Sequence, residues 1–102
     1  MLIKFYVNNA IADLGIAETE ENKILINLYA HKTERALLNT FYHEVLHILF
    51  PQWSEKRVSK QASRCCRGDN TWAMKVLLKL ALKGKLKLRM TKKSLLKNCR
   101  IR

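Results

Sequence analysis

The segment between residues 33 and 51 limits most strongly what this chain can fold into. Its apolar side chains recur at helical spacing and occupy most of the helix circumference, at Ala36, Leu37, Leu38, Phe41, Val45, Leu46, Ile48 and Leu49. So wide an apolar surface predicts a helix that is largely buried and around which the rest of the domain packs. Thr33 is a plausible N-cap, and Pro51, the only proline, predicts that the helix ends near Leu49 or Phe50.

The residues before this helix predict a small sheet. Residues 2–7 (LIKFYV) are apolar and aromatic, as in a β-strand. Residues 14–18 and 24–29 flank the polar sequence TEEN, as the two strands of a β-hairpin flank their turn. We therefore expect an antiparallel N-terminal sheet of about three strands.

Two further helices are expected after the proline. Ser54 is a plausible N-cap for a helix over residues 55–67, and residues 71–83 predict another, which Gly84 ends. Beyond Gly84, apolar and basic residues alternate, which predicts a short strand or an extended arm. The expected fold class is α+β, with the small antiparallel sheet packed on the central helix and on two further helices.

The length of 102 residues fits one domain, expected over residues 1–90 and followed by a basic C-terminal tail over residues 91–102. With 48% hydrophobic residues the chain can bury a modest core, and it has no apolar run of the length of a membrane-spanning helix. The start MLIKFYVNNA does not resemble a secretory signal, and three cysteines, two of them adjacent, do not predict a disulfide framework. We expect a cytoplasmic protein.

Charge is distributed unequally along the chain. Residues 1–50 hold four Lys/Arg and six Asp/Glu, a balance of −2, whereas residues 51–102 hold sixteen Lys/Arg and two Asp/Glu, a balance of +14. This asymmetry suggests an anionic partner such as nucleic acid or anionic lipid, and the alternative is a solvated basic surface that keeps the protein soluble. The candidate nucleic-acid-binding residues are a lysine stripe at helical spacing and the alternating cations that follow it: Lys75, Lys79, Lys83, Lys85, Lys87 and Arg89.

The central helix contains the sequence HEVLH. On a helix, His43 and His47 lie on the same face, so their imidazoles can share one metal ion, and imidazole nitrogens suit zinc. Glu44 then lies beside a metal-bound water and can act as the general base. The alternative is a pair of hydrogen-bonded core histidines with an ion-paired Glu44.

A catalytic zinc needs a third protein ligand, and no histidine follows His47. Glu55 is the favoured candidate, because a chain reversal at the proline can bring it back over the metal; a glutamate in the first turn of a helix is its alternative role. Asp69 is the next candidate, although its GDN sequence is typical of a turn. Cys65 or Cys66 could bind zinc as a thiolate, but adjacent residues on a helix point in different directions, so at most one would, and both are expected in the core. His31 is expected to be exposed.

The run of residues 14–58 resembles the minimal HExxH metallopeptidase-like proteins common in phages, prophages and plasmids, which are similar to ImmA/IrrE and SprT-like zincins. The matching features are a strand of the type KILINLY, then TFYHEVLH, a proline turn and SEKRV. The resemblance implies a zincin-like fold in which residues 24–29 form the sheet edge beside the active site. It also implies that His43, His47 and Glu55 bind zinc and that Glu44 is the base.

The expected function is therefore a zinc-dependent metallopeptidase that hydrolyses peptide bonds by Glu44-assisted attack of zinc-bound water on a protein or peptide substrate. No tyrosine or histidine is a clear transition-state stabiliser; Tyr29, Tyr42 and Trp53 are expected in the core or the cleft wall. One alternative is a non-catalytic or regulatory zinc-binding protein whose basic C-terminal half binds nucleic acid. Another is a purely structural interaction protein that binds no zinc.

Overall fold

The helix that carries HEVLH lies at the centre of the molecule. The structure is a computed structural model that describes residues 1–99, without the side chains of residues 96, 98 and 99. In chain order its elements are β1 (Leu2–Val7), β2 (Gly15–Glu18), β3 (Lys23–Ile26), a short 3-10 helix η1 (Leu28–Ala30), α1 (Glu34–Leu49), α2 (Glu55–Cys65), α3 (Thr71–Lys83), β4 (Lys85–Arg89) and α4 (Lys92–Cys99).

The strands form one mixed sheet in the order β2-β3-β1-β4. The hairpin of β2 and β3 is antiparallel as predicted, and β4 adds to β1 as a fourth, antiparallel strand. However, β1 and β3 pair in parallel, so the prediction of a three-stranded antiparallel sheet is wrong. The alternation of side chains in each strand indicates its faces but not its neighbours. The connection between β1 and β2 places β2 at the edge of the sheet, so that β3 lies between β2 and β1.

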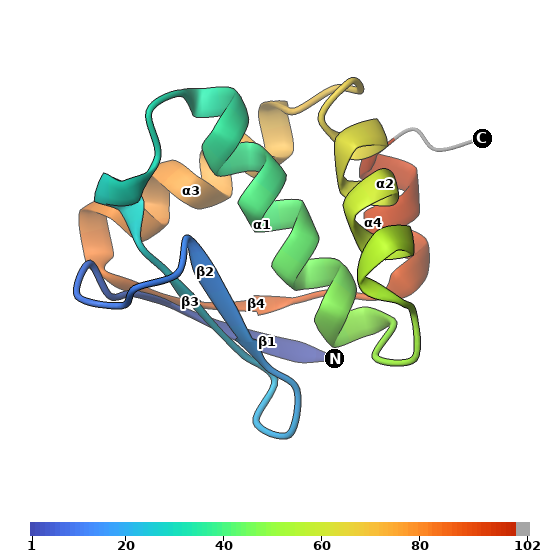
Figure 1. Ribbon diagram of the computed structural model, residues 1–102, viewed down its shortest axis with the longest axis horizontal. Helices are drawn as coiled ribbons and strands as arrows, with labels where there is room; N and C mark the ends of the chain where they lie inside the picture. The colour runs from blue at the N-terminus through green and yellow to red at the C-terminus, as the bar shows by residue number, and fades with distance from the viewer. Residues whose placement is uncertain (100–102) are drawn as a thin grey trace.

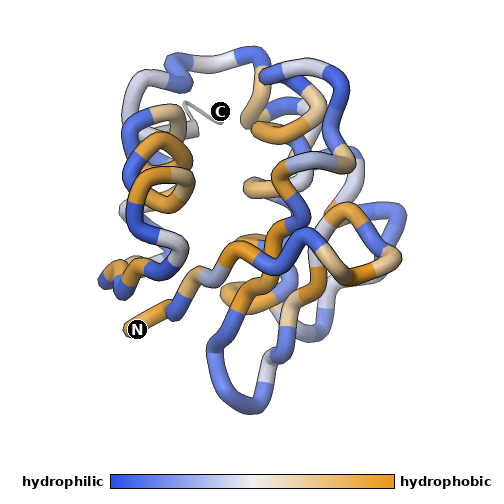
Figure 2. Tube along the Cα trace, turned by 90° about the vertical axis from the view of Figure 1, so that its left-hand side faces the viewer, coloured by the Kyte–Doolittle hydropathy of each residue, from blue (hydrophilic) through white to orange (hydrophobic). Residues whose placement is uncertain are grey.

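The helices and the sheet form two layers, with the helices on one side of the sheet (Figure 1). The side chains of β1 and β3 that face the helices, Ile3, Phe5, Ile24 and Ile26, are fully buried. No helix of residues 1–99 covers the other face of the sheet (Figure 1). The hydrophilic turn between β2 and β3 projects from the body of the molecule (Figures 1 and 2).

The buried helix is confirmed as α1. The Thr33 hydroxyl caps it by accepting a hydrogen bond from the Ala36 amide at 3.1 Å, and the helix ends at Leu49, ahead of the proline. Phe41 lies at its centre and packs against rings from the sheet and from α3, with ring centroids 5.6 Å from Phe5 and 5.8 Å from Trp72. Nine of the sixteen residues of α1 are buried, which agrees with the wide apolar surface of its sequence.

The helices that follow lie close to the predicted ranges. Ser54 caps α2, which ends at Cys65, two residues before the predicted end. The bounds of α3 agree with the prediction, and Gly84 ends it with φ 74°, in the left-handed region that favours glycine. No helix of the described residues is long and apolar enough to cross a membrane.

The segment expected as a basic tail contains the helix α4. Thr91 accepts a hydrogen bond from the Ser94 amide at 3.0 Å, and the side chains of Met90 and Leu95 are buried in the core. Two apolar anchors and a capping residue therefore hold residues 91–95 on the domain. Residues 100–102 of the expected tail lie outside the described residues.

Candidate metal centre

His43 and His47 lie one turn apart on α1 and point to the same place. Their Nε2 atoms are 3.1 Å apart, and both side chains are partly accessible to solvent. In tetrahedral geometry, two zinc ligands at their usual bond length lie about 3.3 Å apart. The spacing of the two nitrogens is thus close to that of two ligands of one ion.

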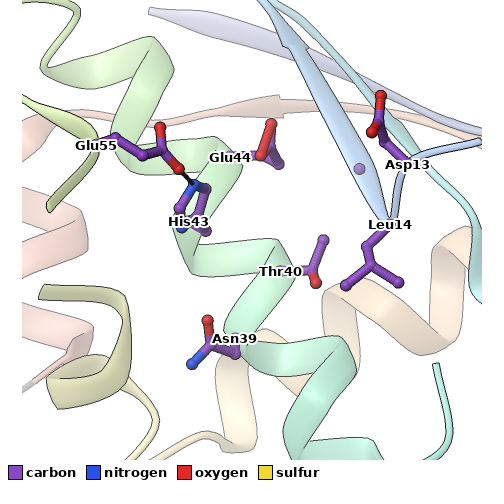
Figure 3. A pocket seen from close by; sticks show the side chains of 8 residues that line it. Asp13, Leu14, Asn39, Thr40, His43, Glu44 and Glu55 are labelled. Atoms are coloured by element: carbon purple, nitrogen blue, oxygen red, sulfur yellow. Dashed lines mark ion pairs between the residues drawn. The ribbon is translucent and has the colours of Figure 1, made fainter. Parts of the chain in front are cut away.

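Glu55, the first residue of α2, reaches both histidines. Its Oε1 atom lies 2.7 Å from Nε2 of His43, and its Oε2 atom lies 2.9 Å from Nε2 of His47. Pro51 ends α1 and the chain reverses, so that the start of α2 returns over the last turns of α1. Figure 3 shows the side chains of Glu55 and His43 next to each other and pointing toward one another, with their ion pair drawn as a dashed line. The expected chain reversal is therefore present.

The three contacts among these side chains cannot all be hydrogen bonds at once. Each Nε2 atom carries either one hydrogen or one lone pair, yet each faces two neighbours, the other nitrogen and a Glu55 oxygen. If both nitrogens donate to Glu55, their N–H groups face one another at 3.1 Å. A cation among the three side chains, by contrast, accepts a lone pair from each of them, so the donor set fits a metal ion.

Glu44 follows the first histidine but is buried, with 8% of its surface exposed. Burial and, to a smaller extent, the nearby charges of Glu55 and Asp13 together raise the pKa of its carboxyl group to about 7. Potential ligand atoms of His43, Glu44 and His47 lie within 4.8 Å of one another, so these three residues could also hold a metal ion. The carboxylates of Glu44 and Glu55 thus both lie close to the imidazoles of the two histidines.

A pocket of about 360 Å³ opens beside the two histidines. Glu55 borders it on one side, and Asp13 and Leu14 border it on the opposite side (Figure 3). The remaining lining residues are Gly15, Asn39, Thr40, His43 and Glu44. Three carboxyl groups therefore surround this pocket in a chain whose net charge is +12, which makes it a local site for cations.

Gly15 allows β2 to lie directly against α1 at the pocket. A Cβ atom at this position would lie 2.8 Å from Cγ2 of Thr40 and 3.1 Å from Cγ of Glu44. The absence of a side chain thus sets the position of Glu44. This contact is not predictable from a local pattern, because it depends on how β2 packs on a helix that begins nineteen residues later.

His31 contacts Thr40, one of the residues that line the pocket, and the expectation that His31 is exposed is wrong. Its Nδ1 lies 2.8 Å from the Asn27 carbonyl oxygen, and its Nε2 lies 2.8 Å from Oγ1 of Thr40. A carbonyl only accepts, so Nδ1 donates, and in the neutral ring Nε2 then accepts from the Thr40 hydroxyl. The sequence pattern missed this role because His31 precedes α1 and its partner lies in the second turn of that helix.

The other candidate ligands lie elsewhere. The Asp69 carboxylate accepts hydrogen bonds from the amide and the hydroxyl of Thr71, as in a turn, and Cys65 and Cys66 are buried in the core as expected. The three aromatic candidates do not line the pocket. Tyr29 is 87% exposed, Tyr42 is buried with its hydroxyl bonded to Asn70, and Trp53 stacks on Phe50.

The strand beside the pocket is β2 and not the strand that the resemblance implied. Residues 24–29 do not form a sheet edge, because β3 ends at Ile26 and lies between β2 and β1. The edge is β2, whose first residue, Gly15, lines the pocket.

The six basic candidates lie outside the pocket and divide between two elements. Lys75, Lys79 and Lys83 are exposed on α3, and Lys85, Lys87 and Arg89 are exposed on β4. Comparison with known proteins adds no assignment: no protein-family model matches the chain, and neither the curated proteins nor the solved structures include a significant match.

Proposed function

We propose that this protein is a zinc-dependent metallopeptidase in which His43, His47 and Glu55 hold the metal and Glu44 is the general base. The observation that carries the proposal is the convergence of the two Nε2 atoms and the Glu55 carboxylate, with separations of 2.7 to 3.1 Å. Two imidazoles and one carboxylate are a common ligand set of catalytic zinc.

The two carboxylates differ in ways that suit different roles. The side chain of Glu55 is 69% exposed and contacts both histidines, so its carboxylate can bind a cation in its present position. Glu44 is buried and borders the pocket from the same helix turn as His43. We therefore assign Glu55 as the third ligand and Glu44 as the base.

When bound, zinc supplies a Lewis acid that polarises the scissile carbonyl and lowers the pKa of water toward about 7. Glu44 supplies the proton transfer: its carboxylate takes a proton from the attacking water and passes it to the leaving amine. A base whose pKa lies near neutrality can carry out both transfers. The close approach of β2 at Gly15 limits the space open to its side chain.

The substrate is proposed to be an extended peptide aligned with β2. The outer edge of β2 has no neighbouring strand within the described residues, and its start lies at the pocket. An extended peptide can pair with the backbone of such an edge and place one of its carbonyl groups near Glu44. The half-exposed side chain of Leu14 borders this path.

Metal analysis together with a peptidase assay tests the proposal. Purified protein should contain one zinc per chain, and E44Q should retain it while cleavage of a fluorogenic peptide library falls by at least about a hundredfold. E55A and H43A should lose both zinc and activity. Zinc binding without cleavage in the unmodified protein would favour the non-catalytic alternative, and full activity of E44Q would exclude Glu44 as the base.

A further inference from the structure

The uncovered face of the sheet carries a cluster of basic residues. Because Ile3, Phe5, Ile24 and Ile26 face the helices, the alternate residues of β1 and β3 face the other way. The same alternation places the exposed residues of β4 on this outer face. The face thus holds five cations, which we call the basic sheet face: Lys4, Lys23, Lys85, Lys87 and Arg89.

Three of these cations stand side by side across the sheet. Lys4 on β1 is directly opposite Lys87 on β4 and directly opposite Lys23 on β3. Like charges at directly opposite positions destabilise a sheet. This row of lysines therefore makes the sheet less stable than neutral residues would, and an anion bound across the row would remove the repulsion.

The charges of the row are only partly balanced by the protein. Lys23 pairs with Glu18 at 3.8 Å, and Glu18 is the one acidic residue of this face. Within the described part of the chain, Lys4, Lys85, Lys87 and Arg89 have no ion-pair partner. Lysines on an edge strand also prevent edge-to-edge association, which is a sufficient reason for Lys85 and Lys87 on β4. Protection of a sheet edge does not explain the presence of Lys4, which lies on an internal strand.

An aromatic residue lies among these cations. Tyr6 on β1 is half-buried on the same face, opposite Lys85, and the Nζ atom of Lys23 lies 5.3 Å from the centre of its ring. Surfaces that bind single-stranded nucleic acid combine cations, which contact phosphates, with aromatic rings, on which bases stack. The open sheet has both at neighbouring register positions.

We propose that the basic sheet face binds the phosphate backbone of single-stranded nucleic acid, with Tyr6 as a stacking position. A lipid surface fits less well, because the most exposed aliphatic side chains, Leu78 and Leu82, lie on α3. None of the residues of the basic sheet face lines the metal pocket, so the proposal does not depend on peptidase activity.

The structure also corrects the candidate residues predicted from the sequence. Lys85, Lys87 and Arg89 belong to the basic sheet face, and Lys4 and Lys23, from the acidic half of the chain, join them. Lys75 and Lys79 are exposed on α3, in the helical layer on the other side of the sheet. They form a matched control, because replacing them changes the net charge by the same amount.

Fluorescence anisotropy with labelled oligothymidylate and oligouridylate tests the proposal. Five phosphate contacts give a salt exponent of about −3.5, so affinity should fall by about a hundredfold between about 50 and 200 mM salt. The double variant K4Q/K87Q should reduce the exponent by about 1.4 and weaken binding by at least about tenfold at low salt. The control K75Q/K79Q should change affinity by less than about threefold.

Further variants separate charge from folding. K4R/K87R keeps both charges and should bind like the unmodified protein. Y6L should weaken binding about tenfold whereas Y6F should not, because only the ring is required. Each variant should retain its metal content, and none should melt at a lower temperature than the unmodified protein, which shows that the fold is intact; K4Q/K87Q should melt at a slightly higher temperature, because it removes the repulsion within the lysine row.

Several results would overturn the proposal. Equal losses in K4Q/K87Q and K75Q/K79Q would mean that net charge alone drives binding. Salt-independent binding, or no binding, would exclude phosphate contacts by this face. Tighter binding to a random-sequence duplex than to either single strand would exclude the stacking surface. Binding to phosphatidylserine vesicles but not to the oligonucleotides would assign the face to a membrane.

Discussion

Glu44 is held in conflicting surroundings at the scale of single atoms. Glu44 is buried, with 8% of its surface exposed, and two other carboxylates, of Glu55 and Asp13, lie close enough to raise the pKa of its carboxyl group. In the metal-free protein both effects favour the neutral acid. A cation bound to the histidines favours the ionised form instead, which is the form that acts as a base.

The pH dependence of the free energy of unfolding should report the raised pKa of Glu44 in the metal-free protein. The folded state holds the pKa of Glu44 at about 7, above the ordinary value of 4.5, so the folded protein binds the proton more tightly than the unfolded chain does. The stabilising contribution of Glu44 to the free energy of unfolding is therefore fully present below about pH 4.5 and is lost as the pH rises through 7. The total loss is about 3 kcal/mol.

Urea unfolding of the chelator-treated protein at several pH values measures this loss. The side chain introduced in E44Q cannot ionise, so the free energy of unfolding of E44Q relative to that of the unmodified protein should rise between pH 4.5 and 7. The control is E34Q, on the exposed first turn of α1, whose free energy of unfolding should change with pH as that of the unmodified protein does. A constant difference between E44Q and the unmodified protein over this range would contradict the raised pKa.

Gly15 provides a second prediction at the residue scale. In G15A the new methyl group meets Cγ2 of Thr40 at 2.8 Å and Cγ of Glu44 at 3.1 Å, so β2 or α1 must move. We expect a loss of about 1–3 kcal/mol in unfolding free energy and a fall in peptidase rate.

G84A is the matched control for this substitution. Gly84 adopts φ 74°, but a Cβ atom there would meet nothing within 4 Å. G84A should therefore cost about 1 kcal/mol through backbone strain alone, with peptidase activity per folded molecule unchanged. If both variants lost stability but neither lost activity, Gly15 would have no part in positioning Glu44.

At the scale of elements, the proposed metal centre would join two helices that are consecutive in the chain. His43 and His47 belong to α1, which is buried between the sheet and α2, whereas Glu55 belongs to the exposed first turn of α2. The start of α2 is otherwise held by its Ser54 cap and by Val58, which is buried. A metal bound at the site therefore links the most buried helix to a more weakly attached one.

Removal of the metal should loosen α2 before the rest of the fold. Hydrogen exchange of the amides of the first two turns of α2 should become at least about tenfold faster in chelator, whereas the amides of β1 and β3 should keep their rates. E55A should show the fast exchange of α2 without chelator and should not respond to it. Uniformly faster exchange over the whole chain would mean that the metal supports global stability instead.

For the molecule as a whole, the parts of the fold that local sequence determines were predictable. The bounds of α1 follow from a capping threonine, an apolar pattern and a proline, and the return of Glu55 to the histidines needs only the short reversal at Pro51. The order of the strands was not predictable, because β1 and β3 pair across a connection whose length is compatible with several arrangements.

The same limit applies to the pocket. His43, Glu44 and His47 are recognisable from their spacing on one helix. The contributions of Asp13, Gly15 and His31 arise from the packing of β2 and of the η1 segment against α1, and no short-range pattern encodes these contacts. A glycine before an alternating strand and a histidine before a helix cap have many ordinary roles, so neither indicates a pocket by itself.

The place of β4 in the sheet has a consequence for biosynthesis. β1 leaves the ribosome well before its second neighbour, β4, which lies more than eighty residues later, with Leu2 opposite Arg89. One edge of β1 therefore stays open until β4 has been made. The residues that line the pocket, by contrast, are all made by Glu55. All the proposed metal ligands are therefore present in the nascent chain before the sheet is complete.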